Sequence, residues 1–149
     1  MKISKIYIGA DHRGFDKKEL IKEYLEKNFV VEDKGAYELN PKDDYPDFAF
    51  KVAEEVSKNF GARGVLICGS SIGIMVAANK VKGIIASNPR TPKEAIIDRQ
   101  HHNSNILCLS ADFMKIEEMK NIIEIWLNTR FDKGRHLRRI NKIFEYEEN

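Results

Sequence analysis

Residues 63–80 constrain the fold of this chain more than any other segment. Residues 65–68 form an unbroken apolar run, which is typical of a strand buried on both faces. Residues 69–73 supply small, permissive side chains, and a helix-prone stretch follows. The segment therefore predicts a strand, a tight polar turn and a helix. Backbone N–H groups at such a turn, with the positive end of the helix, favour an anion such as a phosphate or an enediolate.

Cys68 stands where this strand meets the turn. Nearby N–H dipoles stabilise a thiolate, which makes Cys68 a candidate base or nucleophile. The alternative is a small buried thiol that ends a core strand, and this stretch alone does not decide between the two. Cys108 is the only other cysteine, and the amino terminus has no stretch of signal-peptide character. We therefore expect a reduced, cytoplasmic protein.

The alternation of strand and helix recurs along the chain. Further strands are expected at residues 3–8, 29–31, 83–87 and 105–110. Short connections between alternating elements predict an α/β fold, a three-layer α/β/α sandwich with a five-stranded parallel sheet, Rossmann-like, plus a C-terminal helix. With 149 residues and 42% hydrophobic composition, the chain can build one core, so we expect a single domain over residues 1–149.

Charge and hydropathy exclude several classes of partner. The formal net charge is only +2, from 25 basic and 23 acidic residues, so no global field draws the chain to nucleic acid or to a membrane surface. No apolar run approaches the roughly 20 residues of a membrane helix. No His, Cys and Asp residues show metal-ligand spacing, so we expect no metal site.

Polar residues follow three of the expected strands. Asp11 and His12 follow the first, residues 68–73 close the third, and residues 88–90 follow the fourth. Because ligands of parallel sheets bind beyond the carboxyl ends of the strands, these segments are expected to share one edge. His101 precedes the fifth strand and is expected at the opposite edge, unless a second copy of the chain returns it to the site.

Several segments together resemble the family of ribose-5-phosphate isomerase type B and the related galactose-6-phosphate isomerase subunits. They keep the family's order and approximate spacing over nearly the whole chain. The matching segments are residues 8–14, 45–47, 67–70 with 72–73, 77–81, His101 with Asn105, and residues 134–136 with Arg138 and Arg139.

The resemblance implies an aldose-ketose isomerase that works through a cis-enediol(ate) without metal or organic cofactor. Such chemistry needs a ring-opening acid, a base that moves a proton between C2 and C1, donors for the enediolate and cations for the phosphate. The residues that the resemblance assigns to catalysis are Cys68 as base, Ser70 in the anion hole, His101 as ring opener and Asp11 beside the sugar hydroxyls. Those assigned to substrate binding are His12, Tyr45, Gly69, Ser71, Gly73, His102, Arg135 and Arg139.

The resemblance also implies a homodimer with the active site shared between subunits, or a tetramer made of two such dimers. Each residue has a simpler interpretation: Asp11 as a helix cap, His12 as a solvated surface residue, Tyr45 as part of a loop before a capped helix. The arginines at 135, 138 and 139 are by default an exposed face that the glutamates at 145, 147 and 148 neutralise in part.

The chain departs from the family pattern at several positions. His102 replaces an Asn after the ring opener, Asp112 replaces a basic residue, and Ile85 and residues 88–91 differ after the fourth strand. Asp112 is expected to weaken phosphate binding. Ser71 replaces a frequent Gly, which is tolerable only with a negative φ.

Ribose 5-phosphate and ribulose 5-phosphate are the leading substrate pair. The alternatives are another sugar, such as galactose or allose 6-phosphate or an acidic sugar, and a non-catalytic sugar-phosphate-binding subunit. A nucleic-acid role for the basic tail is disfavoured because its polar face lacks aromatic residues.

Overall fold

A computed structural model describes residues 2–149 and confirms the α/β fold. Five parallel strands form one sheet in the order β2-β1-β3-β5-β4. The strands are β1 (Ile6–Ala10), β2 (Val31–Asp33), β3 (Arg63–Cys68), β4 (Ala86–Ser87) and β5 (Ile106–Ser110). The helices are α1 (Phe15–Glu26), α2 (Tyr45–Lys58), α3 (Ile72–Ala78), α4 (Pro92–Ile97), η1 (Asp98–His102), α5 (Ile116–Asn128) and α6 (Arg135–Glu147).

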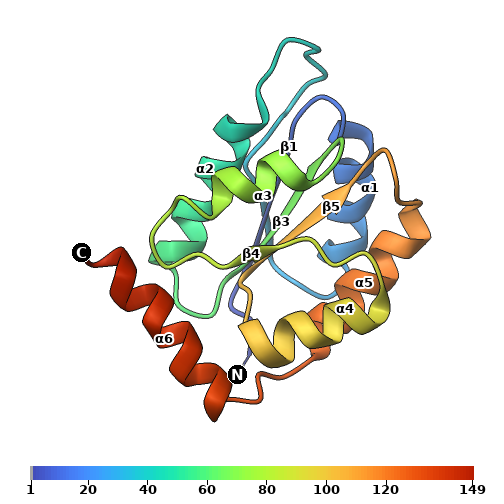
Figure 1. Cartoon of the computed structure of the whole chain (residues 1–149). Coiled ribbons are helices and arrows are strands. Elements are labelled where there is room, and N and C mark those ends of the chain that lie inside the picture. The colour runs from blue at the N-terminus through green and yellow to red at the C-terminus, as the bar shows by residue number, and fades with distance from the viewer. Residues whose placement is uncertain (1) are drawn as a thin grey trace.

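Helices cover both faces of the sheet (Figure 1). Successive strand residues point to opposite faces, so β3 sends Val65 and Ile67 into the core beneath α1 and α5. Leu66 and Cys68 point into the other core, beneath α2 and α3. The expected three-layer sandwich is therefore present, and the strand alternation places the Cys68 side chain under α3.

Several element boundaries differ from the sequence prediction, among them the first strand, which begins at Ile6, and the second, which runs over Val31–Asp33. Two of the differences show how side chains and packing override local pattern. The Asn105 side chain accepts the N–H of Ile85 and donates to the carbonyl of Gly83, so only two residues of β4 remain as strand. The strand expected to end before Gly9 continues to Ala10. A Cβ on Gly9 would meet Val52 at 2.9 Å, so this glycine allows close packing of α2 rather than a turn.

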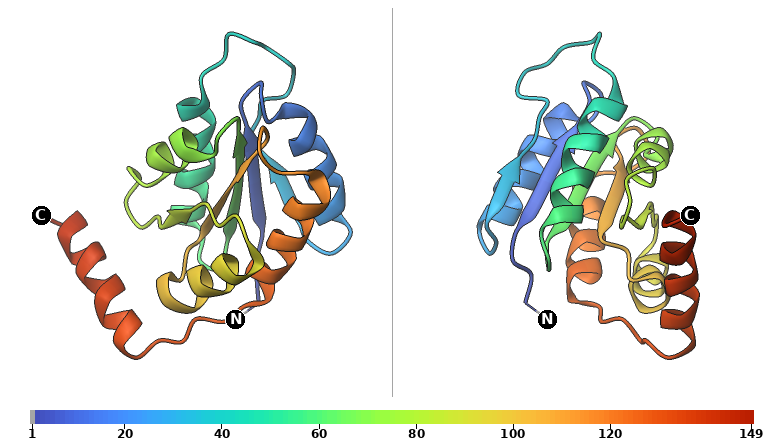
Figure 2. Two further views of the ribbon diagram at one scale, coloured as in Figure 1. Left: turned by 45° about the vertical axis from the view of Figure 1, so that its right-hand side comes forward. Right: turned by 90° about the vertical axis from the view of Figure 1, so that its left-hand side faces the viewer.

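Helix α6 projects away from the sandwich, as the left view of Figure 2 shows. At its end, Glu147 accepts the N–H of Gly83 and Glu148 pairs with Lys82. The expectation that the glutamates neutralise the arginines of α6 is therefore wrong for Glu147 and Glu148, because these two bind the segment before β4 instead.

The chain reverses direction across the sheet between β1 and β3. From β1 it moves outward to β2, and then returns to the other side of β1 with β3. Such a switch point leaves a crevice beyond the carboxyl ends of the two central strands, where ligands of open α/β sheets bind. Asp11 follows β1 and Cys68 ends β3, so both lie at this point.

Candidate active site

The turn after β3 leads directly into α3, and Ser71 is the residue immediately before this helix. Ser71 has φ 68°, a left-handed conformation, so the expectation of a negative φ is wrong. Its side chain is 2% exposed and its Oγ accepts a hydrogen bond from Asn88 Nδ2 at 3.3 Å. The Ser71 hydroxyl therefore holds the segment after β4 against the turn. Ser71 keeps this hydrogen bond although its backbone adopts a left-handed conformation, which glycine adopts more readily. The Ser70 hydroxyl accepts the N–H of Ile72 at 3.2 Å.

Cys68 lies at the base of this turn and is 3% exposed. Burial raises the pKa of the Cys68 thiol and the charge of Asp11 raises it further, whereas the N–H groups of Ile74, Ser71 and Ser70 lower it. The net direction is upward. The expected N–H stabilisation of a thiolate is present, but burial outweighs it, so the thiolate becomes abundant only at alkaline pH.

Asp11 is a buried carboxylate beside Cys68, with 5% of its surface exposed. Its Oδ1 accepts the N–H groups of Arg13 and Gly14, at 3.0 and 3.1 Å, so it organises the turn between β1 and α1. Burial raises the pKa of Asp11 despite these donors. Asp11 thus caps the turn before α1 through Oδ1, as the simpler interpretation expected. Its Oδ2 is left for other contacts.

His12 is fixed by Asp43, a residue that sequence reasoning missed. One carboxylate oxygen of Asp43 accepts the backbone N–H of His12 at 2.9 Å and lies 2.7 Å from its ring Nδ1. The Asp43 side chain is 9% exposed, against 29% for His12. With Nδ1 as donor to the carboxylate, Nε2 is left as the ring nitrogen available to a ligand. His12 is therefore a positioned group and not a freely solvated one.

Tyr45 is brought to the turn after β3 by close packing against Gly73. A Cβ on Gly73 would meet the Tyr45 ring at 2.6 Å and its hydroxyl at 2.9 Å. Tyr45 begins α2 and remains 39% exposed. The residues at 45–47 therefore do more than start a helix, because they set a phenol beside the start of α3.

Arg13 and Asp112 form an ion pair across Gly69. The guanidinium Nη2 lies 2.5 Å from the Asp112 Oδ2. A Cβ on Gly69 would meet Arg13 Nε at 2.9 Å and Asp112 Oδ2 at 3.0 Å, so the pair covers the turn directly. The negative charge at position 112 therefore comes with a cation from the chain itself, which the sequence interpretation of Asp112 did not include.

A second group of predicted residues gathers where η1 meets α6. His101, on the π-helical turn η1, stacks on His136, with ring centroids 4.1 Å apart and planes 9° from parallel. Burial, the neighbouring His101 and the arginines at 135 and 139 lower the pKa of His136. Arg135 and Arg139 share the exposed first turns of α6. His136 belongs to the family motif at residues 134–136, but sequence reasoning assigned it no role.

His101, His136 and Asp132 also come together as possible metal ligands, with one ligand atom of each within 4.8 Å of the others. Their spacing along the chain does not resemble a metal motif, so the sequence could not reveal them. Because the two rings are nearly parallel, their in-plane lone pairs run side by side and do not converge on one point, whereas a shared ion needs convergent ligands. The expectation of no metal site stays a prediction.

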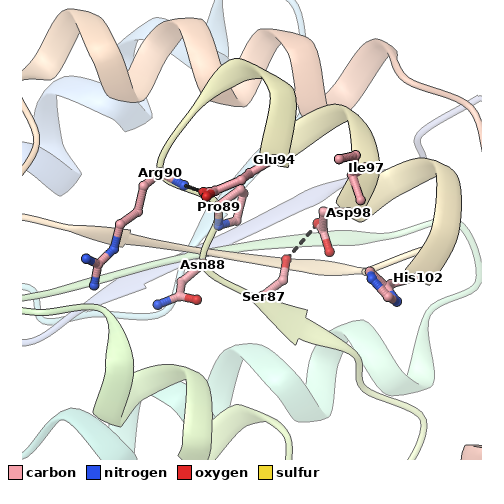
Figure 3. A pocket seen from close by; sticks show the side chains of 8 residues that line it. All are labelled: Ser87, Asn88, Pro89, Arg90, Glu94, Ile97, Asp98 and His102. Atoms are coloured by element: carbon pink, nitrogen blue, oxygen red, sulfur yellow. Dashed lines mark hydrogen bonds between the residues drawn. The ribbon is translucent and has the colours of Figure 1, made fainter.

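His102 lies edge-on to His101, with ring centroids 6.2 Å apart, and lines a separate pocket of about 410 Å³. Figure 3 shows it with Ser87, Asn88, Arg90 and Asp98 around the space after β4. The departures at His102 and residues 88–91 therefore meet in one place. Since Asn88 also donates to Ser71, this pocket adjoins the turn after Cys68.

The structure thus divides the predicted residues into two groups. Asp11, His12, Tyr45 and residues 68–73 lie at the carboxyl ends of β1 and β3. His101, Arg135 and Arg139 gather below, where η1 leads into the amino end of β5 (Figure 1). One chain holds a thiol beneath an N–H-lined turn and, separately, a cationic cluster with imidazoles.

Residues 6–143 match the family model described as Ribose/Galactose Isomerase. A probable ribose-5-phosphate isomerase B of Mycoplasma genitalium is 46% identical over 144 residues, 95% of each chain. One of Mycoplasma pneumoniae is 44% identical over 143 residues, 95% of this chain and 94% of the relative. A crystal structure of ribose-5-phosphate isomerase B from Mycoplasma genitalium with bound ribulose 5-phosphate superposes with a TM-score of 0.96 at 44% identity, covering 100% of this chain and 99% of the other. Among residues 2–149, no helix has the length and apolar character to cross a bilayer.

Proposed function

This chain belongs to the ribose/galactose isomerase family, and on that basis we propose that it interconverts ribose 5-phosphate and ribulose 5-phosphate. The observation that carries the proposal is Cys68 beneath the N–H-lined turn at the switch point, with Asp11 beside it. This arrangement supplies a proton acceptor and a preformed anion hole in one crevice.

Cys68 acts as the base in this proposal. Its thiolate takes the C2 proton of the open-chain aldose, and the electron pair of that bond moves to make a cis-enediolate with its negative charge on O1. The N–H groups of residues 69–73 and the Ser70 hydroxyl stabilise that charge. A proton then passes from the O2 hydroxyl to O1, and the Cys68 thiol returns its own proton to C1. The C2 oxygen thereby becomes the ketone, and no cofactor is consumed.

The other residues prepare the substrate. His101 donates a proton to the ring oxygen to open the sugar, and Asp11 and Tyr45 contact its hydroxyls. His12, Arg135 and Arg139 hold the phosphate, for which the planar guanidinium fork is well shaped. His102 contacts the sugar or its enediolate from the neighbouring pocket.

The site is completed by a second copy of the chain in a homodimer. The separation of the two groups of residues within one chain supports this. Helix α6, which carries Arg135 and Arg139, lies away from the end of β3 and the start of α3, where Cys68 lies (Figure 1). Exposed apolar side chains support it too. Ile72 and Val76 on α3 are 49% and 51% exposed, and Leu137 and Ile143 on α6 are 42% and 50% exposed. Such residues beside both half-sites are typical of an interface between copies.

The first experiment measures conversion of ribose 5-phosphate to ribulose 5-phosphate by the wild type, Cys68→Ala and Cys108→Ala. Cys108 is the other buried cysteine and is 0% exposed. We expect Cys68→Ala to lose turnover and keep its fold, while Cys108→Ala retains turnover. Equal turnover of Cys68→Ala and wild type would remove Cys68 from the mechanism.

Mixing two inactive variants tests the shared site. In a heterodimer of Cys68→Ala and His101→Ala chains, one site has both defects and the other has neither. Random reassociation of equal amounts should therefore recover about a quarter of wild-type activity. Sites contained within one chain would recover none.

A different phosphorylated sugar is the second candidate, and the pocket around His102 motivates it. The departures from the family pattern at His102 and residues 88–91 adjoin the turn after Cys68. Comparing kcat/KM for ribose 5-phosphate with galactose 6-phosphate and allose 6-phosphate decides between these substrates.

A further inference from the structure

A cationic cavity lies at the amino-terminal edge of the sheet, away from the turn after Cys68. Its volume is about 690 Å³. Arg63, the first residue of β3, and Arg99, on η1, line it from the sheet side. Arg130 and Lys133 contribute from the exposed connection between α5 and α6. The lining thus gathers four cations and, within residues 2–149, no acidic side chain.

The two inner arginines are short of counter-charge. Arg99 is 5% exposed, and its Nη1 donates to the carbonyl of Ser104. Arg63 Nη1 donates to the carbonyl of Ala62 at 2.9 Å. In the part of the chain that the structure describes, ion pairs of arginine are limited to Arg13 with Asp112. Most of the N–H donors of both guanidinium groups therefore remain for another partner.

The acid nearest to Arg99 is already engaged. Asp98 Oδ2 accepts from the hydroxyls of Ser87 and Ser104 and from the indole N–H of Trp126. Burial lowers the pKa of Arg63, and burial with the charge of Arg63 lowers the pKa of Arg99 to about 10. Both groups still carry a positive charge at neutral pH. Arg99 is buried and Arg63 is half-buried, and the charge of Asp98 offsets only part of the cost of burying Arg99. An anion between the two guanidinium groups relieves both desolvation and repulsion.

The apolar side chains that line the cavity suit the non-phosphate part of a ligand. Leu127 and Phe131 are half-buried and add apolar surface beside the cations. The volume lies within the roughly 300–1,000 Å³ of small-molecule sites. A planar guanidinium pairs with two phosphate oxygens at once, and two of them suit a terminal phosphate or a diphosphate.

We propose that this cavity binds a phosphorylated small molecule, with its phosphate between Arg63 and Arg99 and its less polar part against Phe131 and Leu127. Arg130 and Lys133 attract the anion at the mouth of the cavity. The site differs from the proposed substrate site, because none of the residues assigned to sugar-phosphate isomerisation lines it.

Calorimetric titration with pyrophosphate and with AMP tests the proposal. Arg139→Ala serves as the background, since it weakens phosphate binding at the proposed substrate site. Adding Arg63→Gln, or Arg130→Gln in case the buried substitution impairs folding, should weaken both probes roughly 10-fold or more. The control Arg138→Gln removes the same charge from the exposed face of α6 and should change either affinity less than about two-fold.

Unchanged affinity in both Arg63→Gln and Arg130→Gln would overturn the proposal. So would failure of both probes to bind the background protein, which is expected if a second copy of the chain fills the cavity. Isomerase assays of Arg63→Gln in the wild-type background should give unchanged kcat and KM in phosphate-free buffer, which separates this site from the proposed isomerase.

Discussion

Arg13 and Asp112 face each other across Gly69, with Nη2 and Oδ2 2.5 Å apart, so the turn after Cys68 carries a guanidinium directly above it. Residue 13 follows β1 and residue 112 follows β5, so the pair joins the two strands that flank β3. Arg13 thus offsets the negative charge of Asp112 beside the turn.

The first prediction concerns this pair. Arg13→Ala should raise KM for ribose 5-phosphate about 10-fold, because it removes a cation over the anion-binding turn. Asp112→Ala should raise KM less, and should have no further effect in the Arg13→Ala background, because Asp112 acts by holding Arg13. Steady-state kinetics of the four chains form a double-mutant cycle. Additive effects would show that Asp112 acts independently. Both side chains are partly exposed, so we expect stability to change by less than about 1 kcal/mol.

Asp43 should act on the substrate only through His12. Asp43→Ala frees the imidazole and should raise KM roughly 10-fold with a smaller change in kcat, if His12 holds phosphate. Asp43→Asn still offers an oxygen to both N–H donors, so we expect it to retain most of the affinity. The measurement is KM for both variants and for His12→Ala. A loss in Asp43→Ala that persists undiminished in the His12→Ala background would contradict this role.

The raised pKa of Cys68 predicts an alkaline activity profile. Because burial disfavours the thiolate, the active form accumulates as pH rises, so kcat/KM should climb toward the pKa of the thiol. A pH-rate profile from about pH 6 to about pH 10 measures this. A profile that is flat across the whole range would indicate that another group abstracts the proton.

The ionised carboxylate of Asp11 should lower the folding stability of the chain at neutral pH. Its pKa is higher in the folded chain than in the unfolded chain, where the usual value is 3.8, so the folded state holds its proton more tightly. Stability from this group is present below the unfolded pKa and is lost as pH rises through the folded pKa. Asp11→Asn does not titrate and should raise Tm by roughly 2–4 °C at neutral pH, while impairing turnover. Thermal unfolding at neutral pH and at about pH 3 gives the comparison, and an equal increase at both would exclude ionisation as the cause.

Local patterns were sufficient to predict the sheet, its helices and the turn after Cys68. An apolar run followed by small residues is typical of a buried strand and a tight turn, so the strand and the place of the turn within residues 63–73 needed no tertiary information. Gly9 shows where that reasoning ends. Its role depends on the approach of Val52 from α2, and a glycine in a strand looks like a turn in the sequence alone.

The parts of the candidate site that escaped prediction are pairs far apart in the chain. Asp43 lies 31 residues from His12 and Asp112 lies 99 residues from Arg13, and no periodicity links such positions. The stack of His101 on His136 likewise depends on how α6 meets η1. Ser71 was judged from intrinsic backbone preference, whereas its hydrogen bond with Asn88 is a tertiary contact.

The separation of the two groups of site residues also determines how much activity a dimer loses when one of its chains is defective. Each chain folds around its own complete core, yet on the proposed arrangement its thiol and its imidazole serve two different crevices. A chain with defects at both Cys68 and His101 would therefore inactivate both crevices of any dimer that it joins. A chain with one of these defects would inactivate a single crevice. In a mixture of doubly defective and intact chains that pair at random, activity would then fall by more than the fraction of defective chains.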